Sequence, residues 1–399
     1  MQLRPILSSL RRHKLAAGLV ILEIAVACAI LCNAVFLIRD RLTRMHVQTG
    51  VAENELVWVK TDGIDSDSAT PLVERNLLAL RGLAGVKAVA VTQTLPLSNS
   101  SMNFNPTLDA SGTKQGPNIA MFIGSPGYLR TLGVTLQDGR DFNDADFGGM
   151  NSWMPQSPSI IVTRALAERL WPAQKAVGQF FWIDKSRYNV IGVVDHLVRG
   201  ELRGKASEYV AMFAARPSPM LSSLYALRVD PPARDRVVRE ATELLVKLNT
   251  QMLISDKGTY AEMRADYFRQ DAAMAWLLAT VCVALLVVTA LGIVGLTSFW
   301  VAQRRRQIGI RRAIGATRGD ILHYFQTENF LIVTLGIVLG MLLAFALNLL
   351  LMTHYELPRL PLYYLPVGAL TLWLLGQLAV LGPALRAAAV PPVVATRSV

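Results

Sequence analysis

Four long apolar segments constrain this chain more than any other feature. Each is long enough to cross about 30 Å of hydrocarbon as a helix, which takes roughly 20 residues. They cover Leu15–Ile38, Met274–Val301, Phe330–Met352 and Leu362–Leu385. The fourth is interrupted by Pro366, Gly368, Gly376 and Gln377. Neighbouring helices can satisfy the backbone groups that such residues free, so the sequence predicts a membrane protein with four transmembrane α-helices.

The basic residues around these segments predict their orientation. Short cytoplasmic flanks of transmembrane helices are enriched in Lys and Arg. Outside residues 39–271 the chain carries 13 Lys and Arg side chains but only four acidic ones. Twelve of the 13 lie on one side if both termini and the loop between the second and third segments are cytoplasmic, and only Arg359 lies opposite. We therefore expect cytoplasmic termini and residues 39–271 outside.

The outside segment is predicted to be a mixed α/β domain. Its 27 basic and 25 acidic residues nearly balance, whereas a DNA-binding protein carries a positive excess on a folded soluble face; we therefore expect no nucleic-acid partner. Apolar and alternating runs predict strands at residues 55–60, 86–94, 159–162, 179–183, 188–194 and 224–229. Helices are expected at residues 71–81, 164–171 and 233–250.

The predicted fold is therefore four transmembrane α-helices with a large extracytoplasmic mixed α/β domain inserted between helices 1 and 2. Loops are expected at residues 98–116 and 148–158, which are rich in turn-forming residues. Residues 40–49 and 260–271 are expected to extend the first two membrane helices outward as a stalk. The expected boundaries, in chain order, are 1–14 (cytoplasmic), 15–38 (helix 1), 39–273 (outside domain with stalk), 274–301 (helix 2), 302–329 (cytoplasmic loop), 330–352 (helix 3), 353–361 (outside loop), 362–385 (helix 4) and 386–399 (cytoplasmic tail).

Residue types that carry catalysis or bind metals form no motif in this sequence. There is no G-x-x-x-x-G-K-[ST] phosphate loop, G-x-S-x-G elbow or H-E-x-x-H pair. Cys28, Cys32 and Cys282 lie in apolar segments, where we expect packing residues rather than disulfides. The carboxylates of residues 138–146 lack the glycine and terminal glutamate of an EF-hand, so a solvated turn is expected. We expect no catalytic residue and no metal site in this chain.

Glu23 is an ionisable residue about eight positions into the first apolar segment. Such a group usually faces the interior of a helix bundle and is a candidate functional residue. The alternative is a neutral or hydrogen-bonded carboxyl group that holds two helices in register. Both interpretations remain open from the sequence.

The loop from Gln303 to Leu322, QRRRQIGIRRAIGATRGDIL, combines arginines with isoleucines and glycines. An arginine run beside a membrane helix is usually a topology anchor. Here isoleucines recur between the arginines, which is typical of an amphipathic segment that lies on the membrane surface. The same isoleucines could equally dock into a cleft on a cytoplasmic partner. Spacing alone does not decide between lipid and partner.

Several groups of residues together resemble one known family. RRRQIGIRRAIGATRGDIL resembles the cytoplasmic loop of FtsX-like, MacB-type ABC transporter permeases, whose pattern is roughly R-x-R-E-I-G-[IL]-R-[RK]-A-[LI]-G-A. The outside domain resembles the MacB periplasmic core domain at SPGYLRTLG (125–133) with GRDF (139–142), and again between residues 161 and 194. PALRAA (383–388) is similar to the family's C-terminal end.

This resemblance implies a non-catalytic permease subunit without a fused ATPase domain, located in the bacterial inner membrane with its large domain in the periplasm. ATP and Mg would be bound by a separate cytoplasmic ABC ATPase dimer, and the permease would pair with a second copy or a paralogue. The family's loop acts as a coupling helix in a groove of that ATPase. Carried over to this sequence, the contact residues are Arg306, Ile308, Gly309, Ile310, Arg311, Arg312, Ala313, Ile314, Gly315 and Ala316.

The resemblance also implies a mechanism called mechanotransmission. Movement driven by ATP would pass through the second helix to the periplasmic domain, and substrate need not cross between the membrane helices. With a periplasmic adaptor and an outer-membrane channel, such a permease exports periplasmic substrates. Two departures from the family pattern leave a heterodimer open. Gln307 replaces the usual glutamate, and Pro391-Pro392 and Thr396 replace an Asp-Pro pair and a leucine.

Three other functions remain alternatives. A lipoprotein-releasing permease uses the same architecture. An FtsX-type regulator of a cell-wall hydrolase usually has an outside domain much smaller than residues 39–271. A membrane-anchored binding protein would need no ATPase, which the coupling-type loop argues against.

Overall fold

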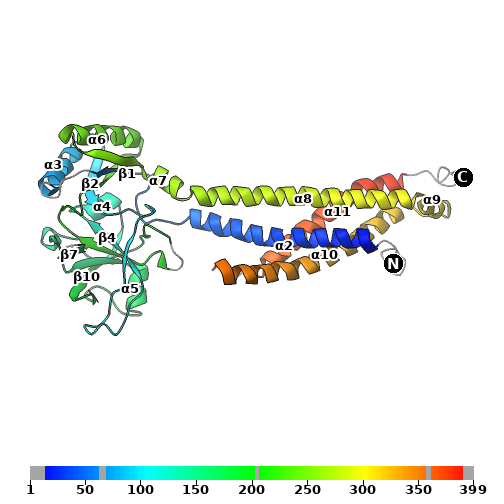
Figure 1. Cartoon of the computed structure of the whole chain (residues 1–399), viewed down its shortest axis with the longest axis horizontal. Coiled ribbons are helices and arrows are strands. Elements are labelled where there is room, and N and C mark those ends of the chain that lie inside the picture. Colours follow the sequence, from blue (N-terminus) through cyan, green and yellow to red (C-terminus); the bar gives the residue numbers. More distant parts are fainter. Residues whose placement is uncertain (1–13, 63–68, 152, 203–205, 356–360, 390–399) are drawn as a thin grey trace. The chain divides into compact units, whose positions relative to one another are not determined.

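The computed structural model describes residues 14–62, 69–151, 153–202, 206–355 and 361–389 (Figure 1). The chain divides into two compact units. One consists of Met1–His46 with Gln270–Val399, and the other is Val47–Arg269. Expected features at residues 1–13, 356–360 and 390–399 lie outside the described residues; they include Arg359, Pro391-Pro392 and Thr396.

The first unit is a helix bundle. In the described part of the chain, four helices are long and apolar enough to cross a membrane. They are α2 (Lys14–Met45), α8 (Arg269–Gln303), α10 (Arg318–Tyr355) and α11 (Tyr364–Ala388). Each contains almost all of one predicted apolar segment, so the expectation of four spans fits this structure. A short helix, α9 (Arg305–Ala313), lies between α8 and α10 in the chain.

Small residues allow α2 and α10 to approach closely. A Cβ atom added to Gly340 of α10 would lie 2.5 Å from the Cβ of Cys28. Asn33 of α2 donates hydrogen bonds to the carbonyl oxygens of Ala29 (2.9 Å) and Ala344 (3.2 Å). Close backbone approach and interhelical hydrogen bonds are the usual source of helix association in lipid. The three cysteines are buried and free, which confirms their expected role as packing residues.

By contrast, α8 leaves most of its apolar side chains uncovered within this single chain. The exposed ones include Trp276, Leu277, Val283, Val287, Val288, Leu291 and Phe299. A transmembrane helix in this state is covered by lipid or by another membrane helix.

The second unit is built on an 11-stranded mixed sheet. Its main strand order is β13-β1-β12-β2-β4-β11-β8-β10-β5, with β3 paired to β4 and β9 to β10. The pairs β10–β8 and β11–β4 are parallel, and the other pairs are antiparallel. A separate two-stranded sheet pairs β6 with β7. The strands are β1 (Leu56–Asp62), β2 (Val86–Thr92), β3 (Met102–Phe104), β4 (Ile119–Gly124), β5 (Leu136–Gly139), β6 (Met150–Asn151), β7 (Met154–Pro155), β8 (Ser159–Thr163), β9 (Phe180–Ile183), β10 (Ser186–Val194), β11 (Val210–Ala214), β12 (Leu224–Val229) and β13 (Leu253–Thr259).

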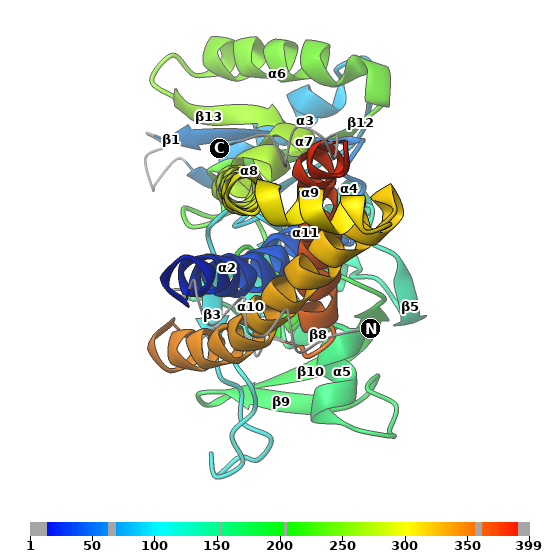
Figure 2. The same ribbon diagram turned by 90° about the vertical axis from the view of Figure 1, so that its right-hand side faces the viewer.

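Helices cover both faces of this sheet, and β1 shows why. Successive side chains of a strand point to opposite faces. Val57 and Val59 enter the hydrophobic cluster under α3 (Ala69–Arg81) and α6 (Arg234–Leu248). Trp58 lies in the cluster of the other face, with α4 (Tyr128–Leu132) and α7 (Tyr260–Tyr267). Figure 2 shows α6 beside β13, and α5 (Arg164–Leu170) contacts β8 and β10 at the other part of the sheet.

The expected strands and helices of this domain are confirmed to within a few residues. The two predicted loops also contain the short strands β3, β6 and β7. The first membrane helix extends outward as expected, because α2 continues to Met45. The expected extension of the second membrane helix is wrong, since residues 260–271 do not form one continuous helix with α8. α7 ends at Tyr267, Phe268 interrupts the helix, and α8 begins at Arg269.

The expectation of a solvated turn at residues 138–146 is wrong for one of its carboxylates, Asp146. Its side chain is buried and accepts hydrogen bonds from Arg140 (2.5 and 3.1 Å) and Ser159 (2.6 Å), while Asp138 and Asp144 are exposed. The carboxylate therefore ties this turn to β8. No cluster of three metal-binding side chains occurs among the residues that the structure describes.

We predict that Asp146→Asn destabilises the domain in a pH-dependent way. The hydrogen bonds from Arg140 and Ser159 lower the pKa of Asp146 to about 2, against about 3.9 for an unfolded chain. A lowered pKa stabilises the fold above the unfolded value, and this contribution is lost as the pH falls from about 4 to 2. Thermal unfolding of the detergent-solubilised chain should show a deficit of about 1–2 kcal/mol at neutral pH. Unchanged stability at neutral pH would contradict this role of Asp146.

Candidate functional site

The loop between α8 and α10 forms the short helix α9, which the bundle holds from one side. Figure 2 shows α9 lying across the bundle between the ends of α8 and α10. Ile308 is only 5% exposed and belongs to the hydrophobic cluster of the bundle, and Gly309 is buried as well. α9 is thus fixed by its apolar side, as expected for an amphipathic segment.

The rest of the predicted contact set lies on the accessible side of α9 or in the turn after it. Ile310 is 44% exposed and Ile314 is 81% exposed, which is unusual for isoleucine in a folded unit. The exposed members of the set are Arg306, Ile310, Arg311, Ala313, Ile314 and Gly315, and the half-buried ones are Arg312 and Ala316. The structure thus separates the set into two buried anchors and a larger accessible group.

The turn after α9 has defined caps on both sides. The amide of Gly315 donates to the carbonyl of Arg312 (3.2 Å) and that of Ala316 donates to Arg311 (3.1 Å). This is the Schellman pattern, and Gly315 has the positive φ of +107° that the pattern requires. Thr317 and Asp320 then exchange hydrogen bonds as a capping box that begins α10. The turn is therefore defined by its local sequence.

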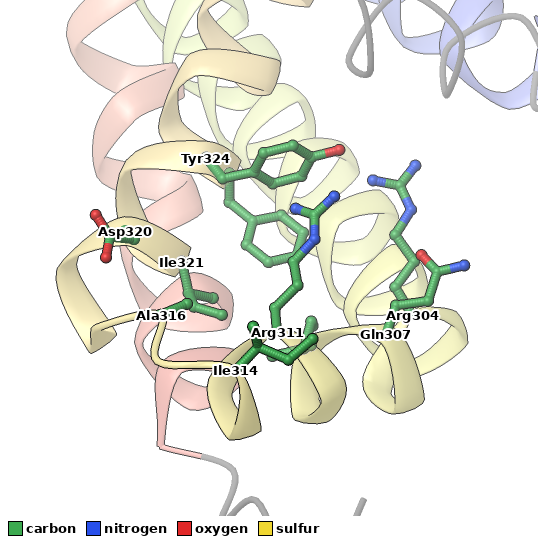
Figure 3. Close-up of a pocket in the computed structure, with 10 residues that line it drawn as sticks. Arg304, Gln307, Arg311, Ile314, Ala316, Asp320, Ile321 and Tyr324 are labelled. Atoms are coloured by element: carbon green, nitrogen blue, oxygen red, sulfur yellow. The ribbon is translucent and has the colours of Figure 1, made fainter. Parts of the chain in front are cut away.

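A groove of about 640 Å³ opens between α9 and the first turns of α10 (Figure 3). The Arg311 guanidinium lies 5.1 Å from the centre of the Tyr324 ring, so a cation–π contact helps to position it. The groove mixes apolar walls with arginines. Its lining residues are Arg304, Gln307, Ile308, Arg311, Ile314, Ala316, Asp320, Ile321, Tyr324 and Phe325.

A buried ion pair fixes the junction of α8 and α9 to α10. Arg304 donates to both carboxylate oxygens of Glu328, at 3.1 and 2.9 Å. The two side chains are only 13% and 2% exposed. Arg304 also lies over the Trp300 ring, 5.5 Å from its centre. Sequence reasoning did not single out Glu328, although an acidic residue two positions before an apolar segment, in a loop rich in arginine, is a usable signal.

A second contact joins α9 to the end of α11. Arg312 donates a hydrogen bond to the carbonyl oxygen of Ala388 (3.1 Å), in the last turn of α11. A cation at a helix C-terminus also interacts favourably with the helix dipole. α9 is therefore linked to α10 and to α11 by side chains from far along the sequence.

Glu23 lies apart from the α9 residues in the chain and packs on α8. A Cβ atom added to Gly292 would lie 2.6 Å from a Glu23 carboxylate oxygen. The other carboxylate oxygen, Oε1, is buried and has no hydrogen-bond partner among the residues that the structure describes. The carboxyl group thus packs against α8 at Gly292, and both interpretations made from the sequence remain predictions.

Comparison with protein-family models covers both units of the chain. Residues 18–247 match the MacB-like periplasmic core domain, and residues 279–392 match the FtsX-like permease C-terminal family. The chain belongs to the MacB/FtsX-like ABC transporter permeases. The expectation from the loop, domain and tail motifs is confirmed.

Related proteins align with this permease over most or all of its length. It is 24% identical to the uncharacterized ABC transporter permease YknZ of Bacillus subtilis, over 99% of this chain and 98% of that one. It is 27% identical to the macrolide export ATP-binding/permease protein MacB 1/2 of Paracoccus denitrificans, over 87% of this chain. The permease spans about half the length of that MacB protein, 51%.

Two of the solved structures similar to this permease are extracytoplasmic domains. The extracellular domain of YknZ matches half of the chain with 19% identity and a TM-score of 0.33. The periplasmic region of MacB from Actinobacillus actinomycetemcomitans covers 54% of the chain with 13% identity and a TM-score of 0.35.

Proposed function

We propose that this chain is the permease subunit of an ABC-type exporter and that it transmits ATP-driven motion from a separate cytoplasmic ATPase to its periplasmic domain. ATP and Mg belong to the ATPase in this scheme, and the chain itself is non-catalytic. The same scheme places the chain in the inner membrane with cytoplasmic termini. The MacB relatives are named macrolide export proteins. Their names support an export function for this chain over the lipoprotein-releasing and regulatory alternatives.

The exposure of Ile310 and Ile314 is the observation that carries this proposal. The two side chains lie four residues apart and protrude from a capped helix and turn, surrounded by Arg306 and Arg311. Apolar anchors at this spacing, rimmed by charges, are typical of a helix that docks into a groove on a partner. Arg304 and Arg312 hold the helix to the bundle from behind.

The linkage of α9 to the membrane helices indicates how motion would be transmitted. A force on α9 reaches α10 directly through the Arg304–Glu328 pair. It reaches α8 through the chain itself, because only Arg304 separates the two helices. α8 is directly preceded in the chain by β13 and α7 of the periplasmic domain, so motion of α8 would reach that domain through the chain itself. Few ionisable residues lie within the spans, which suits mechanical transmission better than a polar conduit for substrate.

The exposed apolar face of α8 supports a dimeric permease. A second copy or a paralogue would cover part of this face, and the lipid bilayer would cover the rest. A periplasmic adaptor and an outer-membrane channel complete the proposed export pathway.

Co-purification tests this proposal directly. We expect the full chain, co-expressed with ABC ATPases encoded next to its gene, to form a detergent-stable complex whose ATP turnover differs from that of the ATPase alone. The isolated ATPase and an ATPase from an unrelated transporter serve as controls. Absence of a complex with every neighbouring ATPase would contradict the proposal and favour a membrane-anchored binding protein.

A further inference from the structure

The chain enters and leaves the periplasmic domain through two neighbouring strands. Residues 47–55 follow α2 and lead into β1, whereas β13 leads into α7 and then α8. β1 and β13 are antiparallel and lie side by side (Figure 2), and Val57 near the start of β1 pairs with Thr259 at the end of β13. The entering and leaving segments therefore meet at the same end of the β1–β13 pair.

β13 is an edge strand, and the entering and leaving segments meet at its α7 end. Among the strands that the structure describes, β13 pairs with β1 alone. Residues 253–257 are exposed or half-buried, and Gly258 and Thr259 at the α7 end are buried. Two antiparallel strands that are pulled apart from a shared end lose their hydrogen-bonded pairs one after another, because each pair bears the load in turn. Movement of α8 relative to residues 47–55 would load the β1–β13 pair in this way.

Arg264 of α7 joins the leaving segment to the entering one. Its guanidinium group donates hydrogen bonds to Oε1 of Glu53 (2.7 Å) and to the carbonyl oxygen of Val47 (2.7 Å). The side chains of Arg264 and Glu53 are 21% and 31% exposed, so solvent ions screen this pair less than a fully exposed one. We refer to these two hydrogen bonds as the Arg264 link.

Residues 47–53 are in turn held by parts of the domain other than β1 and β13. The amide of Ala52 donates to the carbonyl oxygen of Leu132 in α4 (2.8 Å). Gly50, with a φ of +85°, fits closely against the loop after β10, because an added Cβ atom would lie 2.0 Å from the carbonyl oxygen of His196. The Arg264 link therefore ends on a fixed part of the domain.

We propose that the Arg264 link carries force between α7 and residues 47–53 and thereby keeps β13 from separating from β1. This role rests on the proposed function, because ATP-driven movement of α8 supplies the force. The force would pass from α7 through Arg264 to residues 47–53, and from there to α4 and the loop after β10. The domain then moves as one body and keeps its edge strand.

Hydrogen exchange measured by mass spectrometry on the full chain in lipid nanodiscs tests the Arg264 link without an ATPase. Arg264→Met removes the guanidinium group and keeps a long side chain. We expect amide exchange in residues 47–55 to become at least about tenfold faster, the range for losing hydrogen bonds to a charged group. The variant should still fold, because Tyr260 and Tyr267 of α7 keep their own hydrogen bonds to the domain.

Two further variants show whether the effect belongs to the link. Arg269→Met removes an arginine that is 76% exposed and pairs with Asp266, so exchange in residues 47–55 should stay unchanged. Glu53→Gln should speed this exchange, and it should add little to Arg264→Met because both changes weaken one interaction. Unchanged exchange in Arg264→Met, an equal effect of Arg269→Met, or fully additive effects of the two link substitutions would overturn the proposal.

The complex with its ATPase tests whether the link bears load. During ATP turnover, β13 of the unmodified chain should exchange as slowly as it does without ATP. In Arg264→Met we expect β13 to exchange at least about threefold faster with ATP than without it. Equal rates in a variant complex that still turns over ATP would overturn the proposal. Absence of any bound ATPase would contradict the proposed function instead, and exchange measured without ATP would still decide whether Arg264 joins the two segments.

Discussion

The double variant Ile310→Asp with Arg311→Glu should abolish the effect of this permease on the proposed partner ATPase. The aspartate would place a charge where Ile310 offers an apolar anchor, and a buried unpaired charge is strongly unfavourable. The glutamate reverses the charge of an exposed arginine beside it. Truncating a central anchor and reversing a neighbouring charge each cost about 2 kcal/mol or more at interfaces. We therefore expect at least about a hundredfold weaker association, measured by co-purification and ATP turnover.

A control on the periplasmic domain carries the same changes in residue type. Val246 is 42% exposed on α6, and Arg239 is exposed on the same helix. Val246→Asp with Arg239→Glu should leave both complex formation and turnover unchanged. If the α9 double variant still forms a fully stimulated complex, α9 is not the docking helix and the proposed coupling site is wrong.

Arg304→Met should destabilise the membrane unit and uncouple any bound ATPase from the periplasmic domain. The substitution removes the guanidinium from the buried Glu328 carboxylate, and breaking one side of a buried ion pair typically costs about 3–5 kcal/mol. The junction of α8 and α9 would lose its tie to α10, while the contact of Arg311 in α9 with Tyr324 in α10 remains, so ATPase binding should fall less than transport. Thermal unfolding in detergent, together with a drug-efflux or substrate-export assay, measures the two effects.

The double variant Arg304→Met with Glu328→Leu separates stability from coupling. Replacing a buried ion pair by apolar residues of similar size is often neutral or stabilising, so we expect unfolding to return near its original midpoint while export stays low. Arg305→Met, which changes an exposed arginine directly after Arg304 and outside the predicted contact set, is the control for loss of positive charge. A fully restored export rate in the double variant would show that the ion pair stabilises the fold but does not transmit motion.

The four spans and most of the periplasmic elements could be predicted because they depend on local properties. Hydropathy over 20 residues identifies a span, and alternation of side chains identifies a strand such as β10. The strands β4 and β11 were not expected, although both are short apolar runs. A short continuous apolar run has the same pattern in a buried strand and in a buried helix. Periodicity therefore cannot tell which secondary structure it forms. Their pairing with each other in the middle of the sheet decides the matter.

The sequence alone determined the membrane class, the family and the position of the arginine- and isoleucine-rich loop proposed for coupling, because each is written in consecutive residues. Only the tertiary structure decided which residues of that loop are accessible. Ile308 and Ile310 are two positions apart, yet one is buried in the bundle and the other is exposed. Glu328, 24 residues from Arg304, and Ala388 of α11 fix α9 in the orientation that makes this difference. Local patterns cannot reveal such contacts, since they arise only when helices distant in sequence pack together.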